Sequence, residues 1–181
     1  MEIHLGRRAS LEGWTSFESD PLMRRTKDRL NKRCLPCMTG LWEQLRGDVK
    51  RIHLKEALEC WKVTVALESY NDCYDWLTLF SKTFPGEEVY GKFGKGAGGH
   101  KTFAVIFHTE SKARRDELMA LAKRVNEENF PGVGAVYSRG CGIPYEQLLG
   151  PWQGWCEDSP IINPEIVNDV KRSLRKSLFR A

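Results

Sequence analysis

The sharpest short motif in the chain is the pair Cys34-x-x-Cys37. Two cysteines at this spacing can ligate one metal ion together or close a small redox-active disulfide. A structural zinc site needs four ligands, and the sequence holds no second pair of this kind, only His53 and Cys60 further along. Two hypotheses therefore stay open: a metal or thiol-redox site at Cys34 and Cys37, or two half-buried thiols at the end of a helix.

A glycine-rich basic segment is the second candidate site. Glycines allow backbone N–H groups to converge on an anion, and lysines add positive charge. The segment is not a P-loop, because His100 separates glycine from lysine and because a strand rather than a helix is expected next. It could also be a plain hairpin connection. The candidate ligand-binding residues here are Lys92, Gly94, Lys95, Gly96, Gly98, Gly99, His100 and Lys101.

The elements that would position this segment are predicted by residues 61–140. Alternating β-branched residues at 61–67 favour a strand, and Ser69 and Ser111 (or Thr109) are typical helix caps. The order strand, helix, strand, strand, helix, strand is that of a ferredoxin-like α+β fold with an antiparallel sheet. The predicted elements are strands over 61–67, 88–93, 102–108 and 133–138, and helices over 69–84 and 111–126, the second with Arg115 facing outward.

The flanking regions are predicted to be simpler. We expect an irregular arm over 1–19, then a basic helix that starts at Asp20-Pro21 and ends before Cys34, then a helix over 41–59 broken near Gly47. Residues 141–155 read as an aromatic surface loop, and Asn163-Pro164 starts a basic C-terminal helix. The predicted organisation is one compact domain with an N-terminal arm and helical extension (1–60), an α+β core (61–140) and a C-terminal part (141–181).

Within residues 61–140, this element order and two glycine segments resemble the nitrogen-regulatory PII and PII-like proteins. The segments are Gly91 to His100 and Gly132-Val133-Gly134. The resemblance implies a homo-oligomer that binds a nucleotide in clefts between subunits, with Gly132 and Gly134 as further ligand-binding residues. The chain differs from that family at Ala135, which stands where the family has a phosphate-binding lysine.

Nucleic-acid binding is an alternative function. The same topology suits an RNA-recognition motif, in which aromatic residues of the third strand stack on bases. Phe103, Val105 and Phe107 alternate to one face, and packing under the N-terminal helices explains that pattern better. Basic residues also cluster at 24–33 and 171–180, where they could contact phosphates, cover a solvated helix face or favour a helix C-terminus.

The amino-acid composition limits the classes of function that remain open. Lys and Arg number 28 and Asp and Glu 24, so the net charge of +4 is below that of a dedicated DNA-binding protein. No apolar stretch approaches the twenty residues of a membrane span, and six cysteines without an export signal indicate a cytoplasmic location. The histidines are scattered, so no catalytic residues are proposed. The sequence predicts a non-enzymatic binding or regulatory protein with an anionic, nucleotide-like ligand, and identifies no cofactor.

Overall fold

The computed structural model describes residues 2–6, 13–95, 102–140 and 142–179. The chain forms two compact units, each built from two separate stretches. Unit 1 comprises Met1–Lys27 and Trp61–Tyr137, and unit 2 comprises Asp28–Cys60 and Ser138–Ala181. The first sixty residues are divided between the two units, and so are residues 61–140 at Tyr137.

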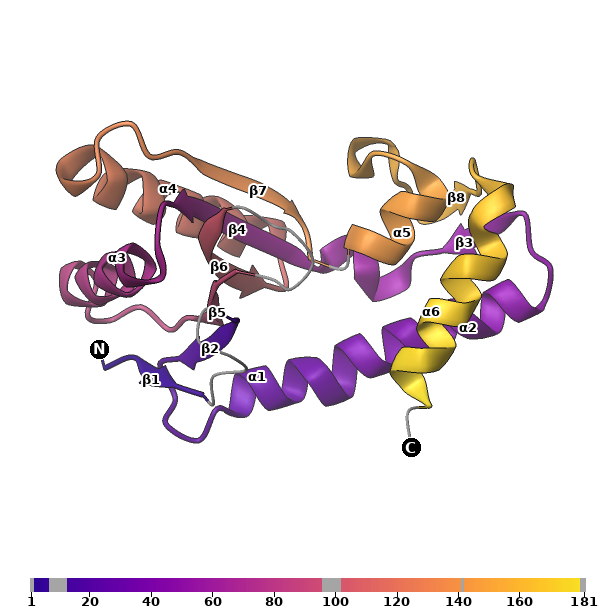
Figure 1. Ribbon diagram of the computed structural model, residues 1–181, viewed down its shortest axis with the longest axis horizontal. Coiled ribbons are helices and arrows are strands. Elements are labelled where there is room, and N and C mark those ends of the chain that lie inside the picture. Colours follow the sequence, from indigo (N-terminus) through magenta and orange to yellow (C-terminus); the bar gives the residue numbers. More distant parts are fainter. Residues whose placement is uncertain (1, 7–12, 96–101, 141, 180–181) are drawn as a thin grey trace. The chain divides into compact units, whose positions relative to one another are not determined.

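Unit 1 is a mixed α+β unit built on a mainly antiparallel sheet (Figure 1). Within the described residues six strands form this sheet, in the order β1-β2-β5-β6-β4-β7. The longest pairing joins β4 to β6, from Trp61 opposite Thr109 to Leu67 opposite Phe103. The strands are β1 (His4–Leu5), β2 (Thr15–Glu18), β4 (Trp61–Leu67), β5 (Tyr90–Gly94), β6 (Phe103–Thr109) and β7 (Ala135–Arg139).

Two helices, α3 (Tyr70–Thr83) and α4 (Lys112–Asn129), pack on one face of this sheet. Their starts confirm the predicted caps, because the hydroxyl groups of Ser69 and Ser111 accept the backbone N–H groups of Asp72 and Arg114, each at 3.1 Å. Between the helices, the Trp76 indole donates a buried hydrogen bond of 2.7 Å to the Asn126 side chain. These contacts fix both helices over the central strands.

The third predicted strand, β6, directs its aromatic residues into this core. Phe107 is fully buried, and its ring centroid lies 4.9 Å from that of Phe80 and 5.8 Å from that of Trp76, both on α3. The expected packing under the N-terminal helices is therefore wrong, because α3 and α4 cover this face. The opposite face of β6 carries Ala104, Ile106 and His108, so Phe103 and Phe107, the aromatic residues of the RNA-recognition pattern, are core residues here.

The N-terminal stretch is part of the sheet rather than an irregular arm. β2 pairs with β5, and Phe17 lies opposite Gly91. Phe17 is fully buried against the rings of Phe93 and Phe107. The buried carboxylate of Glu18 accepts the N–H groups of Arg25 and Thr26, at 2.7 and 3.0 Å. A partner more than seventy residues away decides this pairing, which explains why local sequence patterns missed it.

Helical conformation continues through Cys34 instead of ending before it. α1 (Arg24–Asp28) is followed by a π-helical turn, η1 (Arg29–Cys34), and then by α2 (Leu35–Arg46). Pro36 has no N–H group and its ring would crowd the carbonyl four residues earlier. The wider turn accommodates the ring, since the Leu35 N–H bonds the carbonyl of Leu30, five residues back. A register change within the helix thus replaces the predicted break.

Unit 2 has its own core of buried side chains from α2, α5 and α6, together with residues 52–57 and Trp155. The expected helix does not continue past Gly47, because residues 51–53 form a strand that pairs with residues 158–160, and only residues 55–59 of this range are helical, as a 3-10 turn. Residues 142–149 form a helix rather than a loop, with Tyr145 and Leu148 buried. The remaining elements are β3 (Arg51–His53), η2 (Lys55–Glu59), α5 (Gly142–Leu149), η3 (Trp152–Gly154), β8 (Asp158–Pro160), η4 (Pro164–Ile166) and α6 (Val167–Leu178).

Arg115 of α4 corrects another expectation, because it is buried rather than facing outward. Its guanidinium carbon lies 4.2 Å from the ring centroid of Trp61 and 4.2 Å from that of Tyr137. It also forms an ion pair of 2.6 Å with Asp116. Two aromatic faces and one carboxylate compensate the desolvation of this cation.

None of the helices in the described part of the chain has the length and apolar character needed to cross a membrane.

Candidate functional site

The described part of the predicted glycine-rich site lies at the end of β5. Lys92 Nζ is 4.2 Å from the ring centroid of Trp14, and Lys95 Nζ is 4.7 Å from that of Phe103. Gly94 adopts a φ of 113°, a conformation that side chains disfavour. The end of β5 thus holds two ammonium groups over aromatic faces. The other predicted residues of this segment, Gly96, Gly98, Gly99, His100 and Lys101, lie outside the described residues.

The second glycine segment lines a different hollow. Gly132, with a φ of 86°, and Gly134 border a cavity of about 350 Å³ between the end of α4 and the start of β7. β6 and β4 separate β5 from β7, so three strand spacings, about 14 Å, lie between the two segments. A single chain does not bring Gly94 and Gly134 to one site.

Cys34 and Cys37 are half-buried thiols of unit 2. Cys37 Sγ lies 3.1 Å from the Tyr145 hydroxyl, and both residues border a cleft of about 370 Å³. Across the described residues, no three His, Cys, Asp or Glu side chains are grouped to hold a metal ion. Cys37 is thus placed beside a tyrosine in a cleft, three residues after Cys34. Sequence reasoning missed Tyr145, because it is 108 residues from Cys37 along the chain.

The basic residues around the start of α1 are largely engaged with acidic or carbonyl groups. Arg24 pairs with Asp20 and Arg25 pairs with Glu88. The hydrogen bond from Arg24 holds the pKa of Asp20 below its ordinary value. In the next turn, Lys32 lies 2.9 Å from Asp28. This stretch therefore stabilises its own helix and offers little free positive charge to a phosphate.

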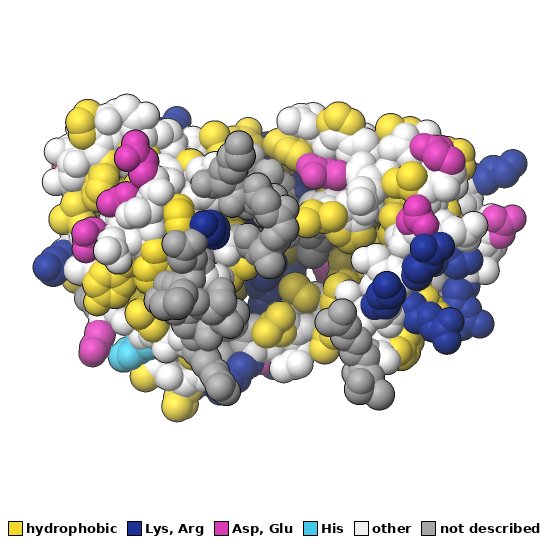
Figure 2. Space-filling view, viewed as in Figure 1, with side chains coloured by type: hydrophobic (Ala, Val, Ile, Leu, Met, Phe, Trp, Pro, Cys, Tyr) yellow, Lys and Arg dark blue, Asp and Glu magenta, His cyan; other side chains and the backbone are white. Residues whose placement is uncertain are grey.

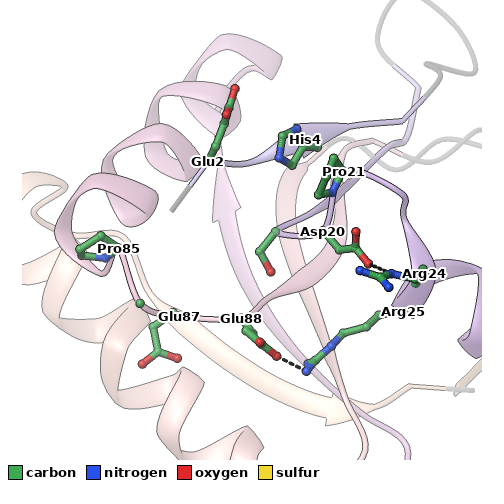
Figure 3. A pocket seen from close by; sticks show the side chains of 11 residues that line it. Glu2, His4, Asp20, Pro21, Arg24, Arg25, Pro85, Glu87 and Glu88 are labelled. Atoms are coloured by element: carbon green, nitrogen blue, oxygen red, sulfur yellow. Dashed lines mark hydrogen bonds and ion pairs between the residues drawn. The ribbon is translucent and has the colours of Figure 1, made fainter.

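A pocket of about 610 Å³ in unit 1 lies beside these ion pairs (Figure 3). Glu2 and His4 line it from the N-terminal side, and Glu87 from the loop that precedes β5. Glu87 is itself paired with Arg114 at 2.7 Å. Both arginines of the lining are neutralised by carboxylates. Among the described lining residues, both arginines are therefore engaged with carboxylates rather than open to an anionic ligand.

The α6 basic surface, defined here as Lys171, Arg172, Arg175 and Lys176, differs from the α1 stretch. Dark-blue side chains gather over this helix in Figure 2. Arg172 lies 3.3 Å from Asp169, whereas no ion pair within the described chain engages the other three cations. Val170 and Leu174, on the opposite side of the helix, are buried in the unit 2 core. The surface thus presents positive charge that the described residues do not neutralise.

An aromatic pair borders the end of this surface. The ring centroids of Phe179 and Trp42 are 5.1 Å apart, and the Arg46 guanidinium carbon lies 4.8 Å from the Trp42 centroid. Phe179 remains 58% exposed. Sequence reasoning identified the basic helix but missed Trp42 and Arg46, because only the packing of α2 against α6 brings them there.

No protein-family model, no curated protein and no solved structure matches this chain. The resemblance of residues 61–140 to the PII proteins therefore remains a prediction. Two of the surfaces described above carry groups of cations: the α6 basic surface in unit 2 and the end of β5 in unit 1.

Proposed function

We propose that this chain is a non-enzymatic protein that binds the phosphate backbone of a nucleic acid through the α6 basic surface. The observation that carries the proposal is the charge balance of that helix. Its outer face holds four cations, three of them exposed and Lys171 half-buried, and Asp169 is the carboxylate paired with one of them in the described structure. Cations spaced along one helix face can neutralise successive phosphates and release counterions.

The packing of α6 favours a nucleic acid over a lipid surface. A membrane-binding helix inserts its apolar face between the lipid headgroups. Here that face is occupied, because Val170 and Leu174 are 3% and 4% exposed in the unit 2 core. Binding to a membrane through α6 would require this core to open. A phosphate backbone needs only the outer, charged face of the helix.

The aromatic pair at the end of α6, Trp42 and Phe179, favours a single-stranded region of the nucleic acid as the part that binds. Exposed aromatic rings bind unpaired bases by stacking, with little sequence preference. The exposed ring of Phe179 is supported edge-on by Trp42 beside the cations of the last helical turn. We infer that a base stacks on Phe179 while the adjoining phosphates contact Arg175 and Lys176.

The double variant Arg175→Gln/Lys176→Gln tests this proposal. We expect weaker binding of a fluorescent oligonucleotide and a smaller salt dependence, with the slope of log K against log salt reduced by about 1.4 for a single strand. Titration by fluorescence anisotropy at several salt concentrations measures both. The matched control is Lys82→Gln/Lys123→Gln, which removes the same charge from exposed positions on α3 and α4 of unit 1.

Equal slopes for the two double variants would contradict the proposal. Binding to phosphatidylserine vesicles but not to the oligonucleotide would contradict the choice of partner. The circular dichroism spectrum of each variant checks that the helices are retained, because Arg175 and Lys176 also favour the C-terminal end of α6.

A second candidate function is the binding of a nucleotide-like ligand at the end of β5. Lys92 and Lys95 favour it, because their ammonium groups lie over aromatic rings beside Gly94. We propose that residues 61–140 are ferredoxin-like, since the order β5-β6-β4-β7 is the one that this fold requires. In a PII-like homo-oligomer, Gly94 of one chain and Gly134 of another could then border one ligand.

Lys95→Gln is expected to weaken ATP binding in equilibrium dialysis at least several-fold, because it removes one cation from the ligand phosphates. Lys82→Gln, at an exposed position on α3, serves as the control of equal charge. Retained ATP affinity in Lys95→Gln would contradict this second function, as would absence of ATP binding by the unaltered chain.

A further inference from the structure

The cleft beside Cys37 combines a thiol with a buried hydrogen-bonding partner. Tyr145 is 3% exposed, and its hydroxyl lies 3.1 Å from Cys37 Sγ. Either group can be the donor while Cys37 is a thiol. Once Cys37 is deprotonated, only the phenol can donate, and its hydrogen bond stabilises the thiolate, which is the form that attacks a disulfide. Since α5 holds Tyr145 in the unit 2 core, this contact is built into the fold.

Cationic side chains border the same cleft. Lys32, Arg33, His53 and Lys55 line it, against the carboxylates of Glu43 and Glu56, and Lys32 is itself paired with Asp28 at 2.9 Å. Lys55 has a φ of 43°, a conformation that costs a non-glycine residue free energy and recurs at ligand sites. Positive charge around a cysteine favours its thiolate and attracts reactants that carry carboxylates.

Cys34 is placed to react with the sulfur of Cys37. Residues three apart in a helix have Cα atoms about 5 Å apart, within the range that a disulfide spans. Their Cβ atoms are about 5–6 Å apart, whereas a disulfide needs about 3.8 Å. The chain between them must therefore bend. Pro36, which lacks an N–H group, and the adjoining π-helical turn interrupt the regular α-helical hydrogen-bond ladder at this point.

We propose that Cys37 and Cys34 exchange with a low-molecular-weight disulfide that carries carboxylates, bound in the Cys37 cleft. The Cys37 thiolate attacks one sulfur of the reactant, which forms a mixed disulfide and releases one reactant thiolate. The Cys34 thiolate then attacks Cys37 Sγ, which forms the Cys34–Cys37 disulfide and releases the second thiolate. The chain loses two electrons and two protons, and the reactant gains them.

The test treats the reduced full-length chain with glutathione disulfide at pH 7 and follows each thiol by peptide mass spectrometry. We expect a Cys34–Cys37 disulfide in the unaltered chain and a stable mixed disulfide at Cys37 in Cys34→Ser. Cystamine, a cationic disulfide, should react more slowly than glutathione disulfide. Cys156 is the exposed comparison thiol. Cys73 is the comparison thiol that should not react, because burial raises its pKa from 9.0 to about 11.

Tyr145→Phe separates the role of the hydroxyl from packing. Loss of the hydroxyl leaves the Cys37 sulfur without this hydrogen bond and so with less thiolate, and exchange should slow about three-fold at pH 7. The pH–rate profile of Cys37 should shift to higher pH. Reaction of Cys156 ahead of Cys37, an absent Cys34–Cys37 disulfide, or an unchanged profile in Tyr145→Phe would each overturn the proposal.

Discussion

Replacement of Gly91 by alanine is expected to lower the free energy of unfolding of unit 1 by about 3 kcal/mol or more. A Cβ atom at this position would lie 1.9 Å from the carbonyl oxygen of Ile106 and 2.8 Å from Cζ of Phe17. The first neighbour is backbone of the central strand β6, which cannot move without breaking its pairing with β5. The close approach of three strands therefore requires glycine here.

Urea unfolding followed by circular dichroism measures this loss, and hydrogen exchange of the β5 and β6 amides assigns it to unit 1. Gly134→Ala is the matched control, because a Cβ at Gly134 would meet no atom within 4 Å. It should change stability little and also remove one predicted ligand-binding glycine. Equal stability of the Gly91→Ala and Gly134→Ala variants would show that β2, β5 and β6 do not pack as described.

Phe107→Ala is expected to lower the free energy of unfolding by about 3–5 kcal/mol. Phe107 is fully buried, and its ring contacts Phe17 at a centroid distance of 5.4 Å as well as Trp76 and Phe80. Truncation leaves a cavity among rigid rings that cannot collapse to fill it. Thermal and urea unfolding measure the effect, with Val136→Ala as the control, since Val136 is 62% exposed.

The conservative variant Phe107→Leu tests the function of the same strand. It should fold and bind the fluorescent oligonucleotide as tightly as the unaltered chain, because Phe107 is a core residue and the α6 basic surface is untouched. A large loss of oligonucleotide affinity in this folded variant would instead assign base stacking to β6. The stability and binding results thus distinguish the two roles of this strand.

Part of the candidate sites could be predicted from the sequence. The motif Cys34-x-x-Cys37 and the basic residues of α6 are apparent in it, because they are clusters of residue types along the chain. Their partners are not, since Tyr145 and the Trp42–Phe179 pair meet only through packing. The charge pattern also could not show that the α1 cations are paired, because Glu88 lies 63 residues from Arg25.

The sequence by itself determined the elements of residues 61–140. The strand 61–67 has the predicted bounds, and Ser69 and Ser111 cap the helices as expected. The signals for these elements, alternation and a capping hydroxyl, act over a few residues and need no distant partner.

Only the tertiary structure decided the remainder. It placed Phe17 and its strand beside β5, carried the helix through Pro36, and buried Arg115 between Trp61 and Tyr137. In each case the local preference was weak or opposed to the outcome. Burial of apolar surface and pairing of backbone groups with segments far along the chain outweighed it, because those gains exist only once the units have assembled.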